Sequence, residues 1–183
     1  MNPFRFLVGV IIVLMFACSS SDPKLEIDKL VKENKIAEAK FKYQALVEKA
    51  DNPNIERQFI NFLFEHNQFY DFKKVSEGFL RRFPGDEEVK QLMFSYYSRL
   101  ASDAERQELY EEAMDYIVSH LLSPDFPEFR KWESRQTTIF KKWYTLMEEK
   151  GDLNGQKKVL SQMKSLGFDN LAKDLAPQLY DEI

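Results

Sequence analysis

Apolar positions recur every three or four residues through most of the chain from 23 to 183, and no window alternates with a period of two. This spacing places apolar side chains along one face of an α-helix, whereas a half-buried strand would need strict alternation. One clear stripe runs through Phe72, Val75, Phe79 and Phe83. The pattern therefore predicts an all-α chain of amphipathic helices.

Turn and cap residues separate these helical stretches. Gly85-Asp86 suits the end of one helix and the cap of the next, and Gly167-Phe168 suits another helix end. Ser102 and Glu105 have the spacing of a capping box, which predicts a new helix from residue 103. The sequence thus predicts about nine helices, near residues 23–33, 36–50, 53–66, 69–83, 87–100, 103–122, 126–149, 153–166 and 170–181.

The predicted helix 53–66 is apolar on more than one side. Phe59 and Leu63 lie along one face, and Ile60 and Phe64 occupy another. A helix that packs between neighbours on both sides needs two apolar faces. Together with the short connections, this favours stacked antiparallel helical hairpins.

Three of the turns share an order of residues. Asn34-Lys35-Ile36 precedes Ala39. Asn67-Gln68-Phe69 lies 33 residues further along the chain and precedes Phe72. Gly151-Asp152-Leu153 forms the third turn. In this order they resemble the turns of the tetratricopeptide repeat family. The chain departs from that pattern where the large Phe72 replaces a small residue.

The resemblance implies a right-handed α-solenoid of hairpin repeats over residues 23–168, closed by a capping helix at 169–183. It also implies a concave groove lined by the first helix of each repeat. Arg57 and Asn61 are similar to the pair with which some members hold a peptide carboxylate, and Phe64 would be the apolar anchor. The groove residues expected on this basis are Arg57, Asn61, Phe64, Gln91, Arg99 and Lys141.

The N-terminus carries a separate signal. One positive charge at Arg5 precedes a 12-residue apolar run from Phe6 to Ala17, and the only cysteine, Cys18, follows directly. The run is too short for a membrane-spanning helix, which needs roughly 20 apolar residues. The pattern indicates a secretory signal over residues 1–17.

The junction at Cys18 resembles the signal and lipobox of bacterial lipoproteins. That resemblance implies a palmitate-bearing lipid on Cys18, with residues 18–22 as a short tether. Since Ser19 rather than Asp follows the cysteine, it also implies an outer-membrane anchor that faces the periplasm. We therefore expect the membrane as one partner, through this lipid.

Composition and motifs argue against several classes of function. The net charge of −4 argues against nucleic acid, which requires a basic face. The two histidines, His66 and His120, have no second metal ligand at helical spacing, and no Gly-x-Ser-x-Gly nucleophile motif occurs. We therefore expect no enzyme activity, no metal and no cofactor other than the covalent lipid.

The expected function is a protein–protein interaction scaffold or envelope assembly accessory that binds a protein or peptide partner at the same membrane. An alternative is a structural envelope protein that binds peptidoglycan or lipid headgroups through the aromatic and basic segment 126–144. An exposed Trp132 beside Arg130 and Arg135 would favour that alternative. A hydrolase with an unrecognised site is a third reading.

The anchor is directly testable. Cys18→Ser removes the only thiol that could be acylated, so the variant should lose incorporation of radiolabelled palmitate and should be released from the membrane or stall as a precursor. Unchanged labelling of the variant would rule out lipidation at this position.

Overall fold

The computed structural model describes residues 22–124, 126 and 128–183. The predicted signal, Cys18 and nearly all of the tether lie outside the described residues. The chain divides into two compact units, one ending at Phe72 and the other beginning at Lys73.

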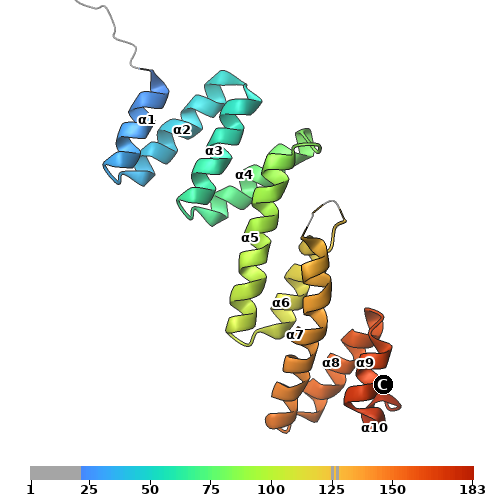
Figure 1. The fold of residues 1–183 in the computed structure, drawn as a ribbon. Helices are drawn as coiled ribbons and strands as arrows, with labels where there is room; N and C mark the ends of the chain where they lie inside the picture. The colour runs from blue at the N-terminus through green and yellow to red at the C-terminus, as the bar shows by residue number, and fades with distance from the viewer. Residues whose placement is uncertain (1–21, 125, 127) are drawn as a thin grey trace, which may run out of the picture. The chain divides into compact units, whose positions relative to one another are not determined.

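The first unit contains α1 (Pro23–Lys32), α2 (Ile36–Ala50), α3 (Pro53–Glu65) and the first turn of α4 (Phe69–Arg82). Two helices begin with a side-chain cap and a proline in the first turn. The Asp22 carboxylate accepts a hydrogen bond from the Lys24 N–H at 3.0 Å, and the Asn52 side chain accepts one from the Asn54 N–H at 2.9 Å. These caps use donors that a helix start leaves without partners. α2 packs against both α1 and α3 (Figure 1).

The second unit contains the rest of α4 and all later elements. Two of its helices begin at acidic caps, since Asp86 accepts from the Val89 N–H at 3.0 Å and Asp152 from the Gly155 N–H at 2.9 Å. The remaining elements are α5 (Glu87–Arg106), α6 (Tyr110–Tyr116), the π-helical segment η1 (Ile117–Leu121), α7 (Phe129–Glu149), α8 (Leu153–Ser165), α9 (Asp169–Leu175) and α10 (Pro177–Tyr180).

The predicted all-α, solenoid-like fold is confirmed. The described residues contain no strand, and within each unit a helix packs chiefly on the next helix along the chain (Figure 1). About nine helices were expected and ten α-helices are described. The additional one arises because the predicted helix 170–181 is divided at Ala176, directly before Pro177, whose missing N–H and fixed φ favour a new helix start.

The hairpins share one type of turn. The residue just after the first helix takes a left-handed conformation, with φ between 55° and 83°. Its N–H, and that of the next residue, donate to carbonyls of the last helical turn, as in a Schellman motif. The left-handed residues of the five turns are Asn34, Asn67, Glu108, Gly151 and Gly167.

Buried side chains keep the same register around four of these turns. They lie seven and four residues before the left-handed residue and five residues after it. These positions are Ile27, Leu30 and Ala39; Ile60, Leu63 and Phe72; Ala101, Ala104 and Ala113; and Leu160, Met163 and Ala172. Four of the five hairpins therefore bury side chains at the same three positions.

The predicted helix start after Ser102 is wrong. α5 continues to Arg106, and the turn comes at Glu108. Ala101 and Ala104 are buried on one continuous face, so a break between them would remove that face from the core. Glu105, read as part of a capping box, instead forms ion pairs with α7. The helix predicted to begin at 126 begins at Phe129.

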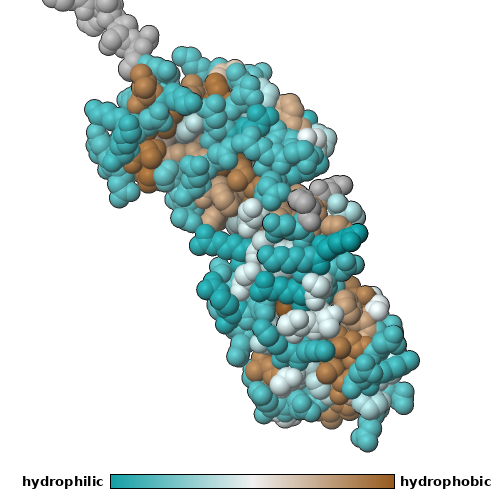
Figure 2. Space-filling model, viewed as in Figure 1, coloured by the Kyte–Doolittle hydropathy of each residue, from teal (hydrophilic) through white to brown (hydrophobic). Residues whose placement is uncertain are grey.

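The apolar stripe of α4 is buried along most of its length. Phe72 and Phe79 are fully buried, Val75 is half-buried, and Phe83 at the helix end is partly exposed. On the face drawn in Figure 2, apolar side chains reach the surface as separate patches among polar ones. The second unit has a continuous core from Phe94 to Ala176 that includes both tryptophans.

A carboxylate joins α5 to α7 in the second unit. The Glu105 side chain is 8% exposed and accepts hydrogen bonds from Arg135 Nε at 2.8 Å and Lys142 Nζ at 2.7 Å. Burial alone would raise the pKa of Glu105, but the hydrogen bonds and charges of Lys142 and Arg135 hold it below its ordinary value. The ionised carboxylate is therefore the form that stabilises the folded unit.

Glu108 offers a test of the turn. A non-glycine residue at positive φ is strained by roughly 1–2 kcal/mol, and glycine removes this strain but loses about 0.4–1 kcal/mol through its larger unfolded-state entropy. Glu108→Gly should therefore raise the free energy of unfolding by about 0.5–1 kcal/mol. Gly167→Ala, at φ 83° with open space around the added carbon, should lower it, which provides the matched control in denaturant titrations. A loss of stability in Glu108→Gly would contradict the expected strain.

Glu105→Gln tests the α5–α7 ion pairs. At neutral pH the variant should lose about 1–2 kcal/mol of unfolding free energy, because two charged hydrogen bonds to partly exposed cations are weakened. Since the folded pKa is depressed, this difference should persist above the unfolded pKa of about 4.3 and vanish as the pH falls through the lower folded value. The exposed Glu133→Gln on α7 is the control. A difference that is independent of pH would contradict the assignment.

Candidate functional site

A hollow of about 240 Å³ lies between α1 and α3 in the first unit. Tyr43 of α2 contributes its ring, which stacks on Phe59 at 5.5 Å and meets Phe62 at 5.4 Å. Its hydroxyl lies 3.5 Å from Gln58 Oε1. The lining residues are Lys24, Ile27, Asp28, Val31, Tyr43, Gln58, Asn61, Phe62, Glu65 and His66.

The carboxylates of Asp28 and Glu65 place negative charge near the Tyr43 hydroxyl in this hollow. Burial raises the pKa of the Tyr43 hydroxyl, and the charges of Asp28 and Glu65 raise it further. Lys24 also lines the hollow and places a positive charge there.

The predicted groove residues Arg57 and Asn61 of α3 lie in different surroundings. Asn61 lines the hollow, whereas Arg57 is not among its lining residues and donates to Asn54 Oδ1 at 2.8 Å. Arg57 and Asn61 resemble a carboxylate-binding pair in sequence, but they do not line this hollow together.

Phe64 is half-buried. Its ring centroid lies 5.2 Å from that of Phe72 and 6.2 Å from that of Phe69. Phe72 occupies the position at which three other hairpins carry a buried alanine, and Phe64 packs against this larger ring. Contact between Phe64 and a partner remains a prediction. Because its ring packs on Phe72, truncation of Phe64 should lower the free energy of unfolding.

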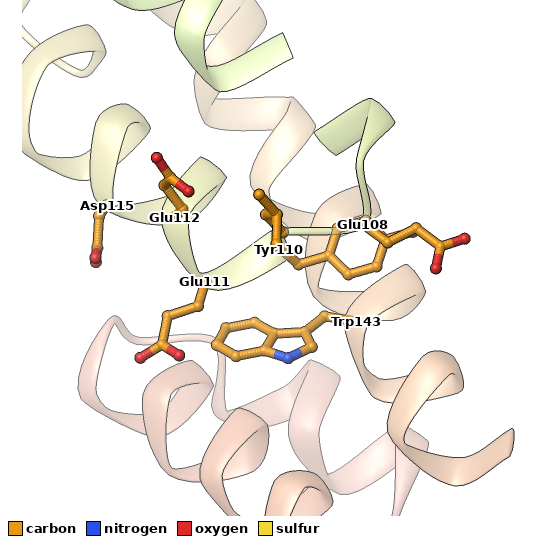
Figure 3. A pocket seen from close by; sticks show the side chains of 7 residues that line it. Glu108, Tyr110, Glu111, Glu112, Asp115 and Trp143 are labelled. Carbon is orange, nitrogen blue, oxygen red and sulfur yellow. The ribbon is translucent and has the colours of Figure 1, made fainter. Parts of the chain in front are cut away.

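The second unit has a larger hollow, of about 450 Å³, at the turn between α5 and α6. Figure 3 shows the Trp143 indole of α7 facing the α6 residues, with the Glu111 carboxylate beside the ring. Leu109 is 47% exposed and supplies apolar surface, while Tyr110 and Trp143 are buried except at their edges. The lining residues are Glu108, Leu109, Tyr110, Glu111, Glu112, Asp115 and Trp143.

A second hollow, of about 330 Å³, adjoins the first through Glu108 and Tyr110. It contains the predicted groove residue Lys141, which is exposed, together with the neighbouring Lys142 that pairs with Glu105. The lining residues are Glu108, Tyr110, Lys141, Lys142, Thr145, Leu146 and Glu149. The two hollows thus present acidic, basic, aromatic and aliphatic side chains around one tyrosine, and we refer to them together as the Tyr110 hollow.

The charges within the Tyr110 hollow are partly paired. Lys158 Nζ lies 2.6 Å from Glu111 Oε2, and Tyr116 donates to Glu112 Oε1 at 2.7 Å. Burial raises the pKa of the Tyr110 hydroxyl, and Glu108 adds to the increase. A neutral Tyr110 hydroxyl can both donate and accept a hydrogen bond.

The remaining two predicted residues lie on α5 and are exposed. The Gln91 carbonyl accepts a hydrogen bond from Ser95 Oγ at 2.9 Å, and Arg99 Nε lies 3.9 Å from Asp103 Oδ2. Neither residue lines the hollow of the first unit or the Tyr110 hollow. Their contact with a partner remains a prediction.

The aromatic side of segment 126–144 lies in the core. Trp132 is 2% exposed, and the Arg135 guanidinium carbon lies 5.0 Å from its ring centroid. Phe140 and Trp143 are also buried. Trp132 is therefore not exposed, whereas an exposed Trp132 would have favoured peptidoglycan or headgroup binding through this segment. Asp125 and Pro127 lie outside the described residues.

Within the described ranges, no group of three or more histidine, cysteine, aspartate or glutamate side chains could hold a metal ion. His120 stacks on Tyr97 with a centroid distance of 3.6 Å, and burial lowers its pKa, as does the charge of Lys73. His66 packs on Phe62 at 4.7 Å. Both histidines therefore make aromatic contacts.

Sequence reasoning missed the Tyr110 hollow because it misplaced the α5–α6 turn. Glu108 replaces the Asn or Gly of the other turns, and it follows Asn67 by 41 residues rather than 33. The buried alanines 101, 104 and 113 were the available signal, since their spacing repeats that of Ile60, Leu63 and Phe72.

The predicted lipidation site, Cys18, lies outside the described residues. No helix in the part of the chain that the structure covers has the length and apolarity required to cross a membrane. Comparison with models of known families, with curated proteins and with solved structures finds no match to this chain.

Proposed function

We propose that this protein is a lipoprotein that binds an extended segment of a partner protein at the membrane to which Cys18 anchors it. It would act as an interaction scaffold or as an accessory in envelope assembly. We place the anchor in the outer membrane, with the helical units facing the periplasm.

The observation that carries this proposal is the mixed lining of the Tyr110 hollow. An extended peptide presents its side chains alternately and its backbone donors and acceptors in between. Tyr110 and Trp143 line it as largely buried aromatic residues, Leu109 offers exposed apolar surface, and Glu108 and Lys141 offer opposite charges. Such a combination provides an anchor and polar groups that fix orientation.

The first unit supports the same function independently. Its hollow also lies beside the first helix of a hairpin and is lined by Asn61 and Tyr43. Its carboxylates, Asp28 and Glu65, suit a backbone N–H or a basic side chain of the partner. The proposed function thus draws on one hollow in each unit.

Position-specific photocrosslinking in intact cells tests the proposal. A photocrosslinking residue in place of Lys141 should give an adduct with a membrane-associated protein. The same residue in place of Lys131, which is exposed on the same helix and lines neither part of the Tyr110 hollow, should not.

Glu108→Lys provides the second arm, because residue 108 lines both parts of the hollow and its side chain is exposed. This charge reversal should reduce the adduct at 141 several-fold while the melting temperature stays nearly unchanged. Adducts that are equal at 131 and 141, or insensitive to Glu108→Lys, would contradict the proposal. A glycan adduct at 131 alone would support the peptidoglycan alternative.

A further inference from the structure

The large hydrophobic side chains with the greatest exposure lie in the first unit. Tyr70 is 83% exposed, Phe41 is 75% exposed and Leu25 is 65% exposed, which exceeds every other large hydrophobic side chain among the described residues. Exposed aromatic side chains that gather on one side of a protein commonly mark an interaction surface.

Two ion pairs join the helices that carry these side chains. Lys40 Nζ of α2 lies 2.7 Å from Asp71 Oδ2, the residue after Tyr70. Lys42 Nζ lies 2.6 Å from Glu26 Oε1, the residue after Leu25. Phe41 lies between these two lysines in sequence, on the helix that the ion pairs join to the first turns of α1 and α4.

Helical register places this surface away from the hollow of the first unit. On α2, Ala39 and Tyr43 are buried, and Tyr43 lines the hollow. Phe41 is two residues from each, so it points to the opposite side of the helix. Tyr70 likewise precedes the buried Phe72 by two residues. Phe41 and Tyr70 thus define an outer face, and a molecule that covers it leaves the hollow open.

The chain that leads to Cys18 departs from the same region. Cys18 precedes Pro23, the first residue of α1, by five residues, a reach of at most about 18 Å. Lys42, which follows Phe41 in sequence, forms the ion pair with Glu26 that joins α2 to that helix start. Aromatic side chains favour the interface between lipid headgroups and acyl chains, and lysine stems extend alongside with the charge in water.

We propose that the outer face of the first unit, formed by Phe41 and Tyr70, docks on the bilayer that holds the lipid of Cys18. The inference rests on the lipid anchor of the proposed function. The net negative charge of the chain means that this contact depends on insertion of the two aromatic rings and not on general attraction to anionic headgroups. Docking would hold the first unit in one orientation and keep its hollow accessible to a partner.

Fluorescence quenching in vesicles tests this docking. Full-length protein is produced in cells, purified in its lipidated form and reconstituted into phosphatidylcholine vesicles with brominated acyl chains. In Phe41→Trp, the added indole should emit at shorter wavelength than in a signal-deleted, unlipidated form of the same variant in buffer, and the brominated lipid should quench it. Leu153→Trp, which is exposed on α8 of the second unit, is the matched control and should show no added quenching. The native Trp132 and Trp143 are buried and supply the background.

The outcomes separate this inference from the proposed function. If the protein fails to associate with vesicles and carries no acyl group, the anchor itself is wrong. If the lipidated protein associates but the added indole of Phe41→Trp is quenched no more than that of Leu153→Trp, the docking is wrong and the anchor stands. An unquenched indole in Phe41→Trp, together with a concentration-dependent dimer that Tyr70→Ser abolishes, would assign the face to a second copy of the chain and would also overturn the inference.

Discussion

The left-handed residue at the end of each hairpin's first helix is the constraint on which the rest of the structure depends. It reverses the chain within a few residues, and the backbone hydrogen bonds around it fix where the second helix begins. The reversal is the same at five turns, and around four of them the buried side chains fall at the same distances from it. Each hollow then lies beside such a turn or beside the first helix that leads into it.

Variation in side-chain size and charge is accommodated within this repeated geometry. The bulk of Phe72, where other hairpins have alanine, is matched by Phe64 across the hairpin. Glu105 lies three residues before the turn at Glu108 and uses its position to hold Arg135 and Lys142 of α7. That ion-pair cluster fixes Lys142 at the edge of the Tyr110 hollow, so one contact contributes both to stability and to the shape of the candidate site.

The two surfaces to which we assign a role in the first unit come from opposite sides of one helix. Tyr43 faces the hollow between α1 and α3, and Phe41 faces outward. A helix between neighbours can serve two partners only if its register keeps the two sets of side chains apart. Our proposals assign the inner side to a segment of a partner protein and the outer side to the lipid bilayer. Both depend on the same buried positions, Ala39 and Tyr43, for their orientation.

The sequence by itself determined the class of fold and most helix positions, because apolar periodicity, acidic caps and the Asn and Gly turns are local signals. Only the tertiary structure decided the place of the α5–α6 turn, since the buried face through Ala101 and Ala104 overrode the capping-box pattern at Ser102. It likewise decided that Trp132 is core and that Phe64 packs on Phe72, because burial depends on what the neighbouring helices present, and no local pattern contains that information.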